Sequence, residues 1–290
     1  DPSRIVRDVQ KLLRTVFRKL FHGGTQSMDL GLKNKVALVA AASHGLGRAS
    51  AFALAQEGAD LVICSRKEES VKKTAEEIRA KTGAKVISVV ADVSRKEDIQ
   101  RFVQTAIREF GTVHVLVNNA GGPPTGQILS MPEEEWEKGI QLTLMSAIRL
   151  VREVLPFMEK QHWGRIISIV SIAAKQPINE LLISSTLRPG ILGLSKVLSN
   201  QYAKDNITVN TVCPGLILTR RQEELSVSRA ADKKMTLEEY LADSAKAIPA
   251  GRLGKPEEIG NVVAFLASEQ ASYINGANLL VDGGSARGIH

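Results

Sequence analysis

The stretch VALVAAASHGLG at residues 36–47 decides the fold. Its first four residues are apolar and include two valines, which predicts a short buried strand. Gly45 and Gly47 follow, and apolar residues then recur at helical spacing through Leu54 and Ala55. A strand, a glycine-containing turn and a helix in this order predict a phosphate site, because the free N–H groups and the dipole at the start of a helix attract anions.

The same alternation of apolar strands and helical segments continues along the chain. Helical segments such as residues 95–110 separate further apolar runs at 61–64, 115–117, 166–170, 207–212 and 277–281. Short strands that are apolar on both faces are typical of a parallel sheet covered by helices. The sequence therefore predicts a single-domain α/β fold, a doubly wound parallel sheet (Rossmann-like) with helices on both faces. Ligands of such folds bind beyond the carboxyl ends of the strands.

Length and composition agree with one domain and limit the function classes. The chain has 290 residues, of which 43% are apolar, enough for one large core. Its two cysteines, Cys64 and Cys213, have no metal-ligand spacing, so we expect free thiols in a cytoplasmic protein and no metal site. No apolar run reaches the roughly 18 to 20 residues that a membrane-spanning helix needs. We therefore expect no membrane span.

The positive charge is concentrated at the N-terminus. The net charge is +7, and residues 1–27 contribute +4, with six Lys or Arg against Asp1 and Asp8. Apolar residues recur there at helical spacing, which predicts a basic amphipathic helix: Ile5, Val9, Leu12, Leu13, Val16, Phe17 and Leu20. Such a helix suits an anionic membrane surface or a partner's groove, although an extension without a part in catalysis is the simpler interpretation. A nucleic-acid partner is not expected, because no recognition motif accompanies the charge.

Three further motifs follow predicted strands. They are NNAG at residues 118–121, PG at 214–215 and VDGG at 281–284. With the turn at 43–47, these motifs resemble those of the short-chain dehydrogenase/reductase family, most closely its 3-oxoacyl-acyl-carrier-protein reductase branch, over residues 36–284. The resemblance implies an NADP(H)-dependent oxidoreductase in residues 28–290 that acts on a small-molecule carbonyl or acyl thioester. The C-terminal motif usually accompanies assembly in this family, so we expect a homo-oligomer, a dimer or homotetramer.

The resemblance also implies the residues that bind the cofactor. All but Arg188, which lies in a predicted helix, are in or near the turns that follow the strands. The residues are Ala41, Ser43, His44, Gly45, Leu46, Gly47, Ser65, Arg66, Asp92, Val93, Asn119, Ala120, Gly121, Arg188, Pro214, Gly215, Ile217 and Thr219. Ala41 replaces a family glycine, and alanine adopts positive φ less cheaply. Arg66 stands where NAD-dependent relatives have an acid, and its charge suits the 2′-phosphate of NADP(H). The alternatives are that the glycine turn binds no ligand and that Arg66 is an ordinary surface arginine.

The catalytic residues depart from the family pattern. Ser171, at the end of the run 166–170, matches the serine that binds the substrate carbonyl in relatives. The family's Tyr-x-x-x-Lys falls on Ser184 and Arg188, and its asparagine falls on Thr143. In relatives the lysine lowers the pKa of the tyrosine from about 10, so that the phenol can exchange a proton near neutral pH. Serine is no comparable acid, and arginine does not release a proton as lysine can.

Three functions remain open at this point. The favoured one is an NADPH-dependent reductase of a 3-oxoacyl-thioester-like carbonyl, in which Ser171 and Ser184 donate hydrogen bonds, Arg188 supplies charge, and a water held by Ser184, Arg188 or Lys175 delivers the proton. The alternative is a non-catalytic nucleotide-binding protein, a sensor or a structural partner of an active relative. Dehydration or epimerisation, with Glu180 or a residue of the polar, lid-like segment 220–244 as base, has the least support.

Overall fold

A computed structural model describes residues 28–288 of the chain. The chain divides into two units, Asp1–Leu30 and Gly31–His290, and all the elements named below belong to the second. The amphipathic helix predicted at residues 1–27 lies outside the described residues, and that prediction remains untested. Among the helices between residues 28 and 288, none combines the length and the apolar character needed to span a bilayer.

A parallel sheet forms the centre of the second unit. Its seven strands in the described part of the chain lie in the order β3-β2-β1-β4-β5-β6-β7, and every neighbouring pair is parallel. The strands are β1 (Val36–Val39), β2 (Asp60–Ser65), β3 (Val86–Val90), β4 (Val115–Asn118), β5 (Gly164–Ile169), β6 (Ile207–Pro214) and β7 (Asn278–Val281). The chain moves outward from β1 to β3 and then returns to the other side of β1, so the strand order reverses between β1 and β4.

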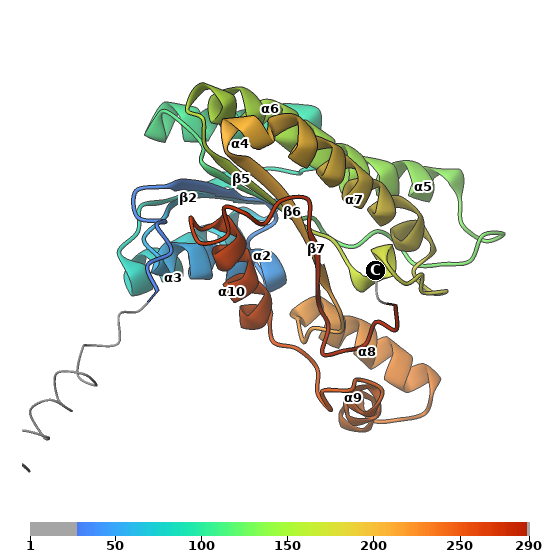
Figure 1. The fold of residues 1–290 in the computed structure, drawn as a ribbon. Coiled ribbons are helices and arrows are strands. Elements are labelled where there is room, and N and C mark those ends of the chain that lie inside the picture. Colours follow the sequence, from blue (N-terminus) through green and yellow to red (C-terminus); the bar gives the residue numbers. More distant parts are fainter. Residues whose placement is uncertain (1–27, 289–290) are drawn as a thin grey trace, which may run out of the picture. The chain divides into compact units, whose positions relative to one another are not determined.

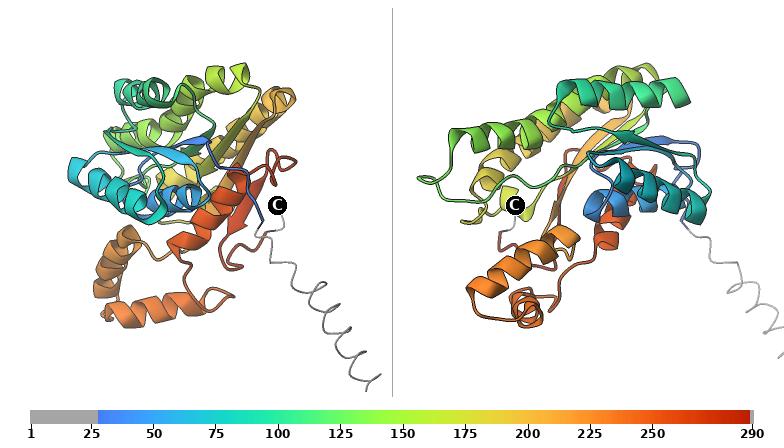
Figure 2. Two further views of the ribbon diagram at one scale, coloured as in Figure 1. Left: turned by 90° about the vertical axis from the view of Figure 1, so that its left-hand side faces the viewer. Right: turned by 180° about the vertical axis from the view of Figure 1, so that it is seen from behind.

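Helices cover both faces of this sheet (Figures 1 and 2). One face carries α2 (Gly45–Gln56), α3 (Glu68–Thr82) and α10 (Pro256–Ala267). The other carries α4 (Lys96–Phe110), α6 (Ser146–Lys160) and α7 (Leu182–Tyr202). The predicted α/β fold is therefore confirmed, and the predicted helix at 95–110 is α4.

The core explains why most residues of the central strands are apolar. All four residues of β1 are buried, and β5 and β6 are buried along their whole length. Leu38 and Leu116 from the sheet pack with Phe102 of α4 and Val154 of α6 in one cluster. Helices on both faces leave these central strands no polar side, and each fully buried side chain of this size contributes about 1.5–3 kcal/mol.

Two irregular segments shape the end of the sheet where the strands terminate. Between β4 and α6, the short helix α5 (Glu133–Gly139) runs into a π-helical stretch, η1 (Ile140–Met145). After β6, α8 (Arg220–Asp232) and α9 (Leu237–Lys246) form a helix pair. This pair is the polar segment 220–244 of the sequence, and Figure 1 shows it beyond α10, away from the sheet.

The helix α7 differs from what its proline suggests. The sequence places Pro189 beside Arg188, where a helix start or a reshaped backbone is expected. Instead, α7 runs unbroken from Leu182 to Tyr202 with Pro189 inside it. Proline has no N–H to offer the carbonyl of Ser185, so the helix lacks one bond at this turn. Ser184 and Arg188 nevertheless remain on one helical face, four residues apart.

Candidate functional site

A cleft of about 890 Å³ opens at the carboxyl ends of the strands. Its walls come from the turns after β1, β4, β5 and β6 and from the helices α7, α8 and α9. Most of the predicted site residues line it: Ala41, His44, Gly45, Leu46, Asn119, Ala120, Gly121, Ser171, Ser184, Arg188, Pro214, Gly215, Ile217 and Thr219. Segments up to about 180 positions apart in the sequence therefore meet here, as the fold class predicts.

The glycine turn is built for close approach to a ligand. Gly45 begins α2 with φ +56°, and Ala41 before it has φ +48°. A Cβ on Gly47 would stand 2.5 Å from the carbonyl oxygen of Ala41 and 2.6 Å from Nδ2 of Asn119. Asn119 Nδ2 lies 3.2 Å from the carbonyl oxygens of both Ala40 and Ala41, to which it donates hydrogen bonds. Asn119 thus ties the turn after β4 to the turn after β1.

The start of α2 fits a phosphate group. His44 occupies the N-cap position without a side-chain cap bond, and the first turn holds no acidic residue. The leading N–H groups of α2 therefore lack a competing carboxylate inside a cleft lined by Gly45 and Leu46. Ala41 adopts the left-handed conformation that the family gives to glycine, so the substitution costs some strain without removing the turn.

A second positive region lies just beyond β2. Arg66 is exposed there, outside the cleft lining, while Ser65 is buried and its Oγ donates to the carbonyl oxygen of Lys67. Burial lowers the pKa of His44, and the charges of Arg220, Arg48 and Lys67 lower it further. Three cations around one imidazole, with Ser65 and Arg66 rather than an acid where β2 ends, suit a dianionic 2′-phosphate.

Asp92 and its neighbours hold the loop after β3 in place. The Oδ1 atom of Asp92 accepts hydrogen bonds from the backbone N–H and the hydroxyl of Ser94, at 2.9 and 2.8 Å. Its backbone N–H donates to Asp98. Val93 is buried in the core, and the carbonyl of Ser43 accepts from Thr74. These predicted residues, like Gly47, shape the ends of the strands without lining the main cleft.

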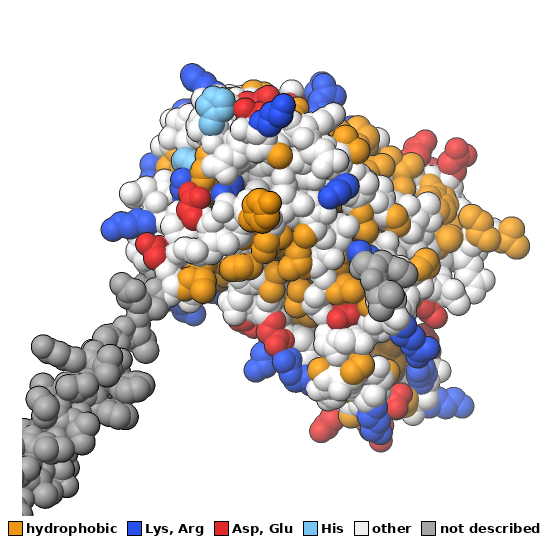
Figure 3. Space-filling model, in the orientation of Figure 1, with side chains coloured by type: hydrophobic (Ala, Val, Ile, Leu, Met, Phe, Trp, Pro, Cys, Tyr) orange, Lys and Arg blue, Asp and Glu red, His pale blue; other side chains and the backbone are white. Residues whose placement is uncertain are grey.

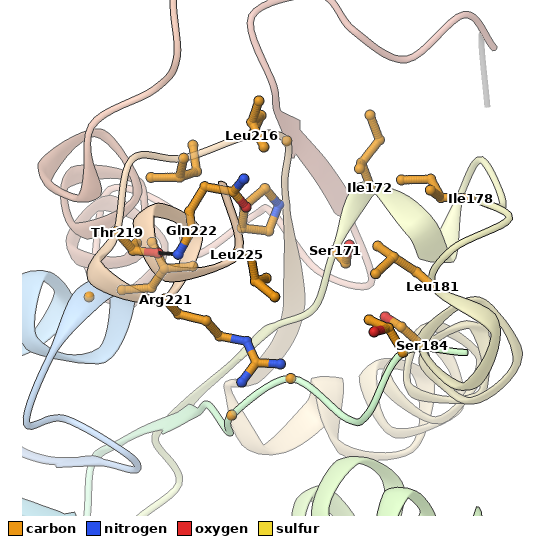
Figure 4. A pocket seen from close by; sticks show the side chains of 18 of the residues that line it. Ser171, Ile172, Ile178, Leu181, Ser184, Leu216, Thr219, Arg221, Gln222 and Leu225 are labelled. Carbon is orange, nitrogen blue, oxygen red and sulfur yellow. Dashed lines mark hydrogen bonds between the residues drawn. The ribbon is translucent and has the colours of Figure 1, made fainter. Parts of the chain in front are cut away.

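Ser171 and Ser184 lie on one wall of the cleft (Figure 4). Ser171 caps the short 3-10 helix η2 (Ile172–Ala174), where its Oγ accepts from the N–H of Ala173 at 3.1 Å. Its hydroxyl hydrogen is left for a ligand. Ser184 is only 6% exposed, and its hydroxyl has no hydrogen-bond partner within residues 28–288. Both hydroxyls are therefore available to donate to a ligand that enters the cleft.

Arg188 is a fixed positive charge beside these serines. Its Nη1 donates to the carbonyl oxygen of Val170, at the end of β5. Burial lowers the pKa of Arg188 to about 10, Cys213 opposes this effect, and Arg221 adds to it. The guanidinium thus stays charged at neutral pH. No carboxylate in the described part of the chain forms an ion pair with it.

Thr143 lies apart from the main cleft, beside a cavity of about 20 Å³. This cavity is also lined by Asn118 and Arg188. Three buried atoms around it have no protein partner in the described residues: Asn118 Oδ1, Thr143 Oγ1 and Arg188 Nε. A cavity of this size holds one water, which would accept from Nε and donate to the two oxygens. The π-helical stretch η1 places Thr143 there.

Sequence reasoning missed the residues that α8 and α9 contribute. Arg221, Leu225 and Arg229 of α8 and Tyr240 of α9 line the cleft. Of the three tyrosines in the chain, only Tyr240 does so. The polar pattern of residues 220–244 does not predict which of their side chains face the cleft. The pair Arg220-Arg221 directly after a helix cap, Thr219, is the one signal that stands out, because cations are disfavoured at a helix start.

No group of three or more metal-binding side chains occurs among residues 28–288.

Comparisons with known proteins agree with this geometry. A family model described as Enoyl-(Acyl carrier protein) reductase matches residues 40–286. The chain is 37% identical over 256 residues to Dehydrogenase/reductase SDR family member 4 of Sus scrofa, covering 88% of each protein. It is 37% identical to the 3-oxoacyl-[acyl-carrier-protein] reductase FabG of Chlamydia muridarum over 259 residues, 89% of this chain and 100% of that protein. Among solved structures, L-sorbose reductase from Gluconobacter frateurii, in complex with NADPH and L-sorbose, aligns with a TM-score of 0.87 and 34% identity over 90% of this chain and 100% of that one.

Proposed function

Since this chain belongs to the short-chain dehydrogenase/reductase family of oxidoreductases, we propose that it is an NADPH-dependent reductase of a small-molecule carbonyl. The observation that carries the proposal is that Ser171, Ser184 and Arg188 face the same cleft as the start of α2. A 3-oxoacyl compound, presented as an acyl thioester, is the proposed substrate, on the similarity to the FabG protein.

The cofactor contacts follow from the cleft lining. The N–H groups of Gly45 and Leu46 would hold the diphosphate, and Arg66 would hold the 2′-phosphate, with His44 beside it. Arg188 would contact the nicotinamide ribose, and the segment from Pro214 to Thr219, which also lines the cleft, would contact the nicotinamide amide. NADPH, the cofactor in the L-sorbose reductase complex, supplies a hydride when bound.

The protein's own part is to orient the carbonyl and stabilise charge. The hydroxyls of Ser171 and Ser184 would donate to the carbonyl oxygen, and the positive charge of Arg188 would stabilise the alkoxide that develops there. Neither serine is an acid comparable to a phenol, so the proton that completes the alcohol would be relayed from solvent through a water held by Ser184, Arg188 or Lys175, and solvent would return a proton to that water. We therefore expect slow turnover.

The direct test is NADPH oxidation with an acetoacetyl thioester. We expect a rate that depends on the thioester and that falls at least about tenfold in Ser171→Ala, because one donor to the developing charge is lost. Thr186→Ala, an exposed change on α7, is the matched control. The proposal fails if the wild-type rate does not exceed that of Ser171→Ala.

A non-catalytic nucleotide-binding protein is the second candidate function. The observation that favours it is the cleft itself, which keeps the phosphate turn but carries Ser184 and Arg188 in place of the phenol and the lysine. The double variant Ser184→Tyr/Arg188→Lys separates the two. If the wild-type chain binds NADPH but only the double variant reduces a carbonyl, the binding role is correct. Glu180, the base considered for dehydration or epimerisation, is exposed at the rim of the cleft.

We also propose a homo-oligomer of this domain. The strand β7 is at the edge of the sheet, and all four of its residues are partly exposed. Figure 3 shows hydrophobic side chains gathered over α10 and β7. A second copy of this chain could pack against an open apolar edge of this kind. Sedimentation or light scattering tests this, and a monomer at micromolar concentration would contradict it. The buried free thiols of Cys64 and Cys213 suit the proposed cytoplasmic setting.

A further inference from the structure

The first turn of α8 carries two arginines in an unfavourable place. Arg220 and Arg221 directly follow the N-cap residue Thr219, where the positive end of the helix dipole disfavours cations. Arg220 has a local partner, because its Nε lies 2.9 Å from Oε1 of Glu224. Within residues 28–288, Arg221 has neither an ion pair nor a side-chain hydrogen bond. The local fold therefore gives no reason for a cation at position 221.

The side chain of Arg221 is exposed and extends from α8 into the cleft. Its Nη2 comes within 3.0 Å of the place where a Cβ on Gly122 would stand, so the guanidinium lies against the loop after β4. Figure 4 shows the side chain running from α8 into the cleft, which Ser184 lines from the opposite side. Burial is the main cause of the lowered pKa of Arg188, and the charge of Arg221 contributes to it. The two guanidinium groups therefore act on the same region.

The surroundings of Arg221 suit a small anion attached to a short apolar chain. Ser184, more than nine-tenths buried, presents a hydroxyl without a partner among the described residues. Ile178 and Leu181 lie near it, and Leu225 lines the cleft from α8. The cations of the lining are Arg188, Arg220, Arg221, Arg229 and Lys233. Its carboxylates are Glu180 and Asp232, both exposed. A ligand that enters this cleft meets an excess of positive charge.

We propose that Arg221 binds a carboxylate of the substrate, so that the enzyme prefers a short oxo acid to a neutral ketone or ester. This inference rests on the proposed carbonyl reductase function, and it names the free 3-oxo acid, rather than its thioester, as the preferred substrate. A guanidinium fork matches a carboxylate with two parallel hydrogen bonds. The carboxylate would also relieve the repulsion between Arg221 and Arg188, while the ketone oxygen lies at Ser171 and Ser184. A thioester offers no charge at this position.

The test compares acetoacetate with its uncharged methyl ester. In the full chain with NADPH, we expect kcat/KM to favour the acid by at least about tenfold, as a charge-assisted pair of hydrogen bonds would give. Arg221→Ala should abolish that preference by lowering kcat/KM for the acid alone, and Arg221→Lys should restore part of it. Arg152→Ala is the matched control, since it removes the same charge from an exposed position on α6 outside the cleft lining and should leave the preference in place.

Two readouts separate the possible outcomes. If Arg221→Ala weakens NADPH binding by about tenfold and lowers kcat/KM for the acid and the ester equally, Arg221 binds the cofactor diphosphate and the inference is wrong. If the wild type reduces acid and ester equally well, it is also wrong. If neither compound is reduced but acetoacetyl thioester is, the inference is wrong and the proposed function stands; if none of the three is reduced, the proposed function fails. Calorimetric titration of acetoacetate into the NADP⁺-saturated protein then decides the inference, with binding lost in Arg221→Ala as the expected result and unchanged binding as the contrary one.

Discussion

Replacing Gly47 by alanine tests the geometry of the phosphate turn. The added Cβ would stand 2.5 Å from the Ala41 carbonyl oxygen, 3.0 Å from that of Ala40 and 2.6 Å from Nδ2 of Asn119. Two of these atoms belong to the backbone, and the third donates both hydrogen bonds that tie the β4 turn to the β1 turn. None can move away without breaking a contact.

The size of the effect follows from those contacts. Loss of the two Asn119 hydrogen bonds costs about 1 kcal/mol each, and overpacking a tight site costs about 1–3 kcal/mol. Because movement of Asn119 would relieve part of the overlap, the two costs do not add fully. We expect Gly47→Ala to lower the free energy of unfolding by about 2–4 kcal/mol and to weaken NADPH binding at least about tenfold.

Urea unfolding followed by circular dichroism and a fluorescence titration with NADPH measure the two effects. Gly193→Ala is the control, because a Cβ there meets nothing within 4 Å and the residue lies inside α7. That change should raise stability by about 0.5–1 kcal/mol. The account of the turn is wrong if Gly47→Ala changes the unfolding free energy by less than about 1 kcal/mol and leaves the NADPH affinity unaltered.

Three further changes test other parts of the account. Ala41→Gly should raise the free energy of unfolding by about 0.5–1 kcal/mol in urea titrations, because residue 41 has φ +48°, and no gain would contradict the strain. Ser184→Tyr/Arg188→Lys should raise kcat for acetoacetyl thioester by about 100-fold, as a general acid is restored, whereas Ser184→Tyr alone should gain less. Burial, and to a lesser degree the charge of Lys35, lowers the pKa of His114 from 6.5 to about 4. The unfolded chain binds the extra proton in this window, so stability should fall as the pH drops from 6.5 towards 4, and His114→Gln should flatten that dependence while His162→Gln leaves it.

The fold could be predicted because the burial pattern of each strand and helix is visible within a short stretch of sequence. The valine-rich run at 36–39 and the spacing through Leu54 and Ala55 each report burial over a few residues, and both appear in the structure as β1 and α2. Gly45 and Gly47 mark the turn between them for the same local reason. The fold class then places the carboxyl ends of β1, β4, β5 and β6 at one cleft.

Contacts between distant segments were not predictable in this way. The bonds from Asn119 to Ala40 and Ala41 join positions 79 and 78 residues apart, and no sequence period encodes them. The direction of Arg221 depends on how α8 packs, which the polar pattern of residues 220–244 does not encode. Pro189 suggested a helix start or a reshaped backbone, but α7 is continuous through it. Tertiary packing outweighs the one backbone hydrogen bond that proline removes. Thr143, predicted as a catalytic position, lies beside the small cavity that Arg188 also lines, and its role stays a prediction.

Calorimetric titration of the purified chain with NADPH and, separately, with NADH tests the central claim most directly. The account predicts saturable binding of NADPH at one site per chain, at least about tenfold tighter than NADH, because Arg66 and its basic neighbours meet the extra phosphate. Arg66→Ala should remove the difference while NADH binding persists. Absence of heat with NADPH, or equal affinity for the two dinucleotides, would contradict it.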